Sequence, residues 1–157
     1  VDERHGVKYG HGNPMRRAAE KPYVTGLSQV GIRNVSSTAR DGYEDARKMG
    51  SDIQSVRQFR ELGVDGMLAR IPEGARYYLT IDIDGFDPSI ASGTGTPSHG
   101  GFLYYEIFEF LDGLSKRGDI VGVDLVEVAP DYDLSGSTTT LAAQMLLNLI
   151  GRIHYNR

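Results

Sequence analysis

The chain has 157 residues, of which 39% are hydrophobic, and a formal net charge of −4 from 17 basic and 21 acidic side chains. This size suits a compact domain with a core, and the acidic balance argues against nucleic acid as a partner. No cysteine is present, and no apolar run approaches the roughly 18–20 residues that span a bilayer. We therefore expect a cytoplasmic protein without disulfides or membrane contact.

The first half of the chain alternates between loop, helix and strand patterns. A polar, Gly-rich segment leads into a short helix that begins near Pro14, because proline is favoured in the first helical turn. The following patterns predict a strand at 27–34, a helix capped by Ser37 or Thr38 and ended by Gly50, a weak strand at 53–56 with a helical alternative over 56–62, and a short helix at 64–71.

The second half shows stronger patterns. They predict a strand at 77–83, a Gly-rich loop at 85–101, an amphipathic helix at 102–116, an apolar strand at 119–128 and an apolar helix at 138–153. Strands that alternate with helices imply right-handed βαβ units. The expected fold class is therefore α/β, a three-layer sandwich with a parallel sheet flanked by helices.

The end of the strand at 77–83 is the most informative segment. Asp82 and Asp84 are two residues apart, so on a continuing, buried strand their side chains would point the same way. Such carboxylates repel each other and lose hydration unless a cation lies between them, and oxygen ligands favour a hard divalent ion. Glu127 lies at the end of the next predicted strand, at the sheet edge where such folds bind ligands.

Three motifs resemble the ureohydrolase family, which includes arginases, agmatinases and guanidinobutyrases. They are Asp82-Ile-Asp84-Gly-Phe-Asp87-Pro88 with Gly93-Thr-Gly-Thr-Pro97 and Gly100-Gly101, then His11-Gly-Asn13-Pro-Met-Arg16-Arg17-Ala18, and Val123-Asp-Leu-Val-Glu127-Val-Ala-Pro130. The resemblance covers nearly the whole chain and is strongest to agmatinase-type and guanidinobutyrase-type members.

The resemblance implies a site for two Mn²⁺ ions and the hydrolysis of a linear guanidino compound, of agmatine or guanidinobutyrate type, to urea and an amine. At the matching positions, Asp82 and Asp84 are the metal ligands. Asp87 is a catalytic-site residue that orients the loop, and His11 shuttles protons. Glu127 pairs with the guanidinium group, for which a bidentate carboxylate is suited.

The resemblance also adds Asn13, together with His11, to the substrate-binding residues. Within the family, the loop from Asp2 to Gly10 is expected to face the tail of the substrate. Arg4 and Lys8 in this loop favour a carboxylate tail, whereas its acidic residues favour an amine tail, so the substrate stays open.

The sequence departs from the family in lacking two segments that supply the other metal ligands, Gly-Gly-Asp-His and Asp-Ala-His-x-Asp. Residues 1–157 thus resemble the C-terminal portion of a single ureohydrolase domain, a partial domain with only two metal ligands. We expect this polypeptide alone to be inactive, and the complete protein to be a homo-oligomer, a trimer or hexamer as is common in the family.

Two other functions stay open. Haloacid-dehalogenase phosphatases, which use Mg²⁺, also begin with an apolar strand and Asp-x-Asp-Gly, although Phe86 stands where they carry Thr or Val. A catalytically inactive subunit that scaffolds an assembly is the non-enzymatic alternative. Metal content would separate these possibilities.

Overall fold

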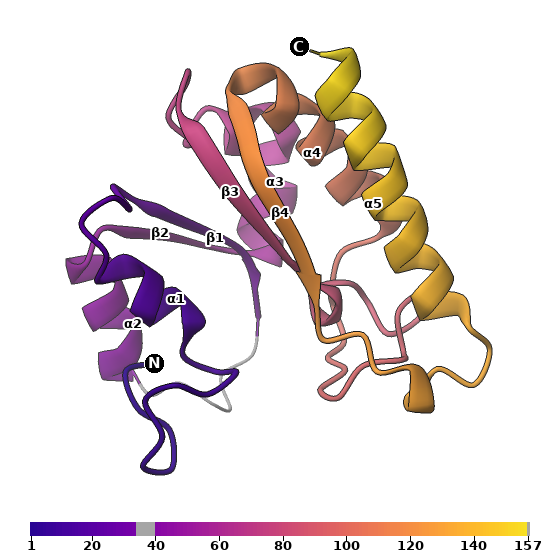
Figure 1. Ribbon diagram of the computed structural model, residues 1–157, viewed down its shortest axis with the longest axis horizontal. Helices are drawn as coiled ribbons and strands as arrows, with labels where there is room; N and C mark the ends of the chain where they lie inside the picture. The colour runs from indigo at the N-terminus through magenta and orange to yellow at the C-terminus, as the bar shows by residue number, and fades with distance from the viewer. Residues whose placement is uncertain (34–39, 157) are drawn as a thin grey trace. The chain divides into compact units, whose positions relative to one another are not determined.

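The computed structural model describes residues 1–33 and 40–156 (Figure 1), and these form two compact units, Val1–Ser55 and Val56–Arg157. Each unit contains a pair of parallel strands accompanied by helices, which is the α/β organisation expected from the sequence. Within the described ranges, no helix is both long enough and apolar enough to cross a membrane.

The first unit contains α1 (Pro14–Ala19), β1 (Leu27–Ile32), α2 (Arg40–Lys48) and β2 (Ser51–Ser55). β1 and β2 pair in parallel, with Leu27 opposite Ser51. Gly50 has φ 84°, the left-handed conformation that commonly follows a helix, so the predicted end of α2 is confirmed. The predicted caps of this helix, Ser37 and Thr38, lie outside the described residues.

The second unit contains α3 (Val56–Leu68), β3 (Arg76–Asp82), a 3-10 turn (Ile83–Gly85), α4 (Tyr104–Arg117), β4 (Asp119–Val126), a second 3-10 turn (Pro130–Tyr132) and α5 (Ser137–Tyr155). β3 and β4 pair in parallel, with Asp82 opposite Val126, so their carboxyl ends share one edge. Within α3, Gly63 has φ 70° and ψ 175°. This non-helical residue interrupts α3 between the helical segments considered at 56–62 and 64–71.

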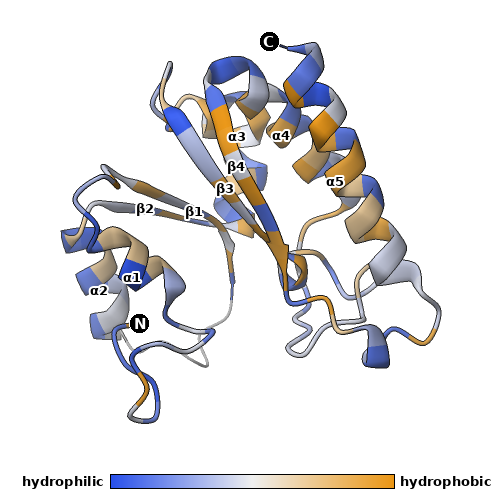
Figure 2. Ribbon diagram, in the orientation of Figure 1, coloured by the Kyte–Doolittle hydropathy of each residue, from blue (hydrophilic) through white to orange (hydrophobic). Residues whose placement is uncertain are grey.

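The core of the second unit lies among α3, α4, α5 and the sheet. Phe59 of α3 contacts Phe102 and Phe110 edge-on, with ring centroids 4.8 Å and 5.6 Å apart. Figure 2 shows apolar residues along β4 and α5. The other buried apolar side chains of this core include Met67, Ile81, Ile83, Leu111, Leu114, Ile120, Met145 and Leu149.

Alternate residues of β3 differ in exposure, as in any strand with one covered face. Ile81 is buried in the core, whereas Tyr78 is 67% exposed and Thr80 and Asp82 are exposed on the other side. We expected a buried strand, and within this unit that expectation is wrong for the Tyr78 face, because the core lies on the Ile81 face.

The start of α5 is held by a carboxylate from the preceding loop. Asp133 is only 7% exposed, and it accepts hydrogen bonds from the N–H groups of Thr138 at 3.2 Å and Thr139 at 2.7 Å. These amides belong to the first helical turn and have no acceptor within the helix. Hydrogen bonds from Thr139 are the main cause that lowers the pKa of Asp133 below its usual value.

The Gly-rich loop after β3 joins this same junction. The Gly93 amide donates to Thr138 Oγ1 at 2.8 Å, and the Ala129 amide donates to the Gly93 carbonyl at 2.9 Å. The loop, the segment after β4 and the start of α5 are therefore bonded together beside the carboxyl edge of the sheet.

Candidate active site

The carboxyl end of β3 presents two aspartates in different local structures. β3 ends at Asp82, and Asp84 lies in the 3-10 turn that follows, so the prediction that both extend from one continuing strand is wrong. The Asp84 amide donates to Asp82 Oδ1 at 3.2 Å, and fully buried Ile83 anchors the turn in the core. The turn, rather than strand alternation, keeps the two side chains together.

Glu127 joins this edge from the neighbouring strand. It directly follows Val126, the residue opposite Asp82, so the predicted meeting of the two strand ends is confirmed. Glu127 has φ 65°, a left-handed conformation that is uncommon for residues other than glycine. Such strained residues often occur where the surrounding structure holds a side chain for function.

The charges at this edge oppose one another. Although one side of Asp82 is open to solvent, the surrounding protein removes much of its hydration, and this is the main cause that raises its pKa. Repulsion by the nearby Asp84 and Glu127 carboxylates adds to it, and together these effects bring the pKa of Asp82 to about 6. We call Asp82, Asp84 and Glu127 the acidic edge.

Two further residues organise the acidic edge. Thr96 Oγ1 donates to Asp84 Oδ2 at 2.7 Å, a role that the sequence did not reveal beyond placing Thr96 in a tight loop. Asp87 accepts the Gly100 amide at 2.9 Å and the Gly101 amide at 3.2 Å. Hydrogen bonds from Ser89 and then from these glycine amides lower the pKa of Asp87 to about 2. Asp87 therefore fixes the loop through these amides, and its role in catalysis stays a prediction.

His11 and Asn13 lie in the first unit and differ in accessibility. His11 is exposed. Asn13 is only 2% exposed, and its side chain accepts from the Gly10 amide at 3.2 Å and donates to the Val1 carbonyl at 3.0 Å. Asn13 thus organises the N-terminal loop, and its contact with substrate stays a prediction.

The basic pair that follows the His-Gly motif is engaged within the first unit. Arg17 forms an ion pair with Asp2 and lies 3.1 Å from Glu20 Oε1, with its guanidinium 5.6 Å from the centre of the Tyr9 ring. Arg16 also contacts Glu20 at 3.1 Å. The hydrogen bond from Arg17 lowers the pKa of Asp2, so this carboxylate is compensated inside the unit.

Metal-ligand groups are sparse in the described ranges. Among residues 1–33 and 40–156, no group of three or more His, Asp or Glu side chains is arranged to hold a metal ion. Asp82 and Asp84 are therefore the candidate metal ligands within these described ranges.

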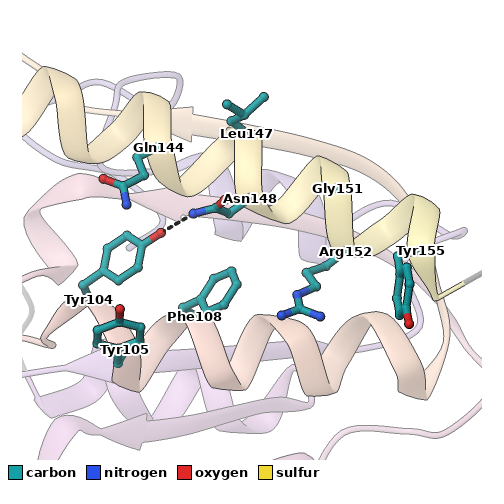
Figure 3. A pocket seen from close by; sticks show the side chains of 9 residues that line it. All are labelled: Tyr104, Tyr105, Phe108, Gln144, Leu147, Asn148, Gly151, Arg152 and Tyr155. Atoms are coloured by element: carbon teal, nitrogen blue, oxygen red, sulfur yellow. Dashed lines mark hydrogen bonds between the residues drawn. The ribbon is translucent and has the colours of Figure 1, made fainter.

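A groove on the second unit, shown in Figure 3, has no residue of the acidic edge in its lining. It lies between α4 and α5 and encloses about 460 Å³. Tyr104 Oη accepts a hydrogen bond from Asn148 at 2.6 Å within it, and Arg152 lies 5.6 Å from the centre of the Phe108 ring. The lining residues are Tyr104, Tyr105, Phe108, Gln144, Leu147, Asn148, Gly151, Arg152 and Tyr155.

The fold and the acidic edge define an α/β protein with a carboxylate site at the carboxyl ends of parallel strands. The family model described as the Arginase family matches residues 1–151, and the chain belongs to that family. Its arginase-type fold is a partial domain, because the chain spans about half the length of the curated relatives it matches.

Three known proteins illustrate this membership. The chain is 35% identical over 154 residues to the guanidinobutyrase of Pseudomonas aeruginosa, a match that covers 95% of this chain and 48% of that protein. It is 39% identical over 149 residues to the guanidinopropionase of the same organism, covering 90% and 46%. The solved structure of proclavaminate amidino hydrolase from Streptomyces clavuligerus has a TM-score of 0.89 at 31% identity and covers 100% of this chain and 53% of that one.

These findings confirm the ureohydrolase resemblance inferred from the motifs. Membership in the arginase family leaves the haloacid-dehalogenase interpretation of Asp82 and Asp84 without support.

Proposed function

We propose that this chain is the C-terminal portion of a manganese-dependent ureohydrolase domain that converts a linear guanidino compound to urea and an amine. The observation that carries the proposal is the acidic edge of Asp82, Asp84 and Glu127 in a chain of the arginase family. The similarity to a guanidinobutyrase and a guanidinopropionase supports a guanidino substrate.

Within the acidic edge, Asp82 and Asp84 suit a divalent cation. A carboxyl group whose pKa is raised by burial and by neighbouring carboxylates is a group that a cation would stabilise in its charged form. We assign Asp82 and Asp84 as Mn²⁺ ligands, because carboxylate oxygens match this ion. When bound, such ions activate water and orient the reacting groups.

The other residues are assigned roles in substrate and proton handling. Glu127 pairs with the planar guanidinium through its two oxygens, in a bidentate geometry that excludes misaligned substrates. His11, the histidine of the His-Gly motif, is assigned the transfer of protons to and from the reacting groups. Asp87 holds the Gly100–Gly101 backbone rather than the reacting atoms.

The N-terminal loop favours a substrate with a carboxylate tail. Asp2 is compensated by Arg17, whereas Arg4 and Lys8 are exposed. Once the charge of Asp2 is neutralised in this way, the loop is more positively charged than its composition suggests. A positively charged loop favours a guanidino acid over agmatine. The relatives named guanidinobutyrase and guanidinopropionase support the same choice.

Two carboxylates leave most of an ion's coordination to other groups. We therefore propose that this polypeptide alone binds Mn²⁺ weakly and releases no urea, and that the remaining ligands come from the other half of the domain. The complete protein is proposed to be a homo-oligomer.

Complementation tests this function. The chain is coexpressed with the half of the guanidinobutyrase that it does not match, and copurified material is assayed for Mn²⁺ content and for urea release from 4-guanidinobutyrate and agmatine. The expected result is two ions per assembled unit and turnover that favours the guanidino acid. Assembly without Mn²⁺ would instead support an inactive scaffold, and turnover by the isolated chain would refute its proposed inactivity.

A further inference from the structure

Arg60 of α3 connects three segments of the second unit. Its Nε and Nη2 donate to the two carboxylate oxygens of Glu106 at 2.7 Å and 3.1 Å. Nη2 also donates to the Gly101 carbonyl at 2.9 Å. Glu106 Oε2 in turn accepts the Leu103 amide at 2.7 Å. One guanidinium thus holds the backbone where the Gly-rich loop enters α4.

The Gly101 peptide is packed directly on the turn that precedes it in the chain. A Cβ on Gly101 would lie 2.4 Å from the Phe86 carbonyl carbon and 2.5 Å from the Asp87 nitrogen. The amides of Gly100 and Gly101 donate to Asp87 Oδ2, and the Asp87 amide donates to the Phe102 carbonyl at 2.9 Å. Any displacement of Gly101 therefore displaces Asp87.

Asp87 is three residues from Asp84, and the 3-10 turn at Ile83–Gly85 joins them to β3. The Phe102 amide donates to the Gly85 carbonyl at 3.0 Å, which ties this turn to the same segment. The path from Arg60 to Asp84 thus consists of the hydrogen bond to Gly101, the hydrogen bonds that join residues 100–102 to Gly85 and Asp87, and the backbone between Asp84 and Asp87.

We infer that Arg60 is a positioning residue for the acidic edge, acting by fixing the Gly101 carbonyl so that Asp87 and the turn carrying Asp84 keep their places. A guanidinium suits this role because its planar fork binds a carboxylate and a carbonyl at once, whereas an ammonium group lacks that geometry. The relevance of this role to metal binding rests on the proposed function, but the bonded arrangement does not.

The competing explanation is an ordinary ion pair between α3 and α4. Removing either partner of an ion pair abolishes it equally, so Arg60→Gln and Glu106→Gln would then have the same effect. A positioning role separates them, because only Arg60→Gln removes the bond to Gly101. Arg57→Gln is the matched control, since Arg57 is an exposed arginine on the same helix.

Amide hydrogen exchange of the metal-free chain, followed by NMR, provides the test. Arg60→Gln is expected to speed exchange at Gly100 and Gly101 by about tenfold, while amides within β3 and β4 keep their rates. Arg57→Gln should leave Gly100 and Gly101 near their original rates. Glu106→Gln, which keeps the Arg60 guanidinium that binds the Gly101 carbonyl, should speed their exchange clearly less than Arg60→Gln. Arg60→Lys, which keeps the charge, should show exchange rates at Gly100 and Gly101 between those of the wild type and Arg60→Gln. It serves as the decisive variant if Arg60→Gln does not fold.

Unchanged exchange in Arg60→Gln, or equal acceleration in Glu106→Gln, would overturn the inference. Addition of MnCl₂ distinguishes it from the proposed function. If the wild-type chain shows no paramagnetic broadening of the Asp82 and Asp84 amides, the metal assignment fails while the exchange result stands. If broadening occurs, Arg60→Gln should require several-fold more Mn²⁺ than Glu106→Gln, and equal requirements would contradict positioning of the acidic edge.

Discussion

Gly93 and Asp133 lie so close together that no side chain fits at position 93. A Cβ there would lie 2.4 Å from the Asp133 Cβ and 2.8 Å from its Cγ. Because Asp133 caps α5 and the Gly93 amide binds Thr138, this contact locks the Gly-rich loop to the start of the last helix. The loop next to the acidic edge is therefore a supported segment of the core.

Gly93→Ala is expected to destabilise the chain, because the new methyl group must push Asp133 away from the amides that it caps. Overpacking of this kind costs about 1–3 kcal/mol. Urea denaturation monitored by circular dichroism measures the change. Gly95→Ala is the control, since an added Cβ at Gly95 meets no heavy atom within 4 Å, and a similar loss in both variants would contradict the contact.

Asp133→Asn should lower the melting temperature at neutral pH, because the charged acceptor of the Thr138 and Thr139 amides is lost. The pKa of Asp133 is lowered in the folded chain, so its stabilisation is present above the unfolded pKa and disappears as the pH falls through the folded value. The two proteins should therefore begin to converge as the pH falls through the unfolded pKa near 4, and meet only below the lowered folded pKa of Asp133. Asp131→Asn, an exposed neighbour, should match wild type throughout, and a gap that persists at low pH would argue against the charge.

Asp82→Asn should stabilise the metal-free chain at pH 7, because it removes a charge that has lost much of its hydration and is repelled by Asp84 and Glu127. The folded pKa of Asp82 is raised to about 6, so its contribution favours folding below the unfolded pKa near 4 and is lost as the pH rises through about 6. Because one side of Asp82 is open to solvent, which screens the charge, we expect a gain of only about 1 kcal/mol.

Thermal melts in EDTA across pH 4–8 check this prediction. The variant and the wild type should coincide near pH 4 and separate as the pH rises. Added Mn²⁺ should raise the melting temperature of the wild type and leave Asp82→Asn unchanged. A variant less stable than wild type in EDTA would show that the edge is not repulsive.

Thr96→Val should weaken Mn²⁺ binding without unfolding the chain, because it removes the hydroxyl that donates to Asp84 Oδ2. Groups that orient a metal ligand in this way typically contribute about 10–100-fold in affinity. Titration followed by the electron paramagnetic resonance of free Mn²⁺ measures the loss. Thr140→Val, an exposed site on α5, controls for the substitution itself, and equal affinities would remove Thr96 from the site.

The sequence predicted the element order of the second unit because its strands and helices differ clearly in periodicity and end at Gly or Pro. It also predicted that the ends of β3 and β4 meet, since parallel strands share an edge. It misplaced Asp84, because a 3-10 turn of Ile83–Gly85 and a continuing strand have the same local composition.

The residues that sequence reasoning missed act over long separations. Arg60 contacts Gly101 and Glu106, more than 40 positions away along the chain, and nothing local distinguishes it from other exposed arginines. Asn13 was assigned to substrate because of its motif, yet its burial shows a role in folding the loop. The motifs identified the segments that form the candidate site. The hydrogen bonds then distinguish the side chains that fix the backbone of these segments from those that face solvent.

The left-handed backbone of Glu127 (φ 65°) means that folding and catalysis favour different residues at this position. Glycine would adopt this conformation without steric penalty and would favour folding, but it would delete the carboxylate needed for the proposed chemistry. Relatives that have lost catalytic activity are expected to carry glycine or asparagine at this position. The residue found there would therefore help to distinguish active from inactive relatives.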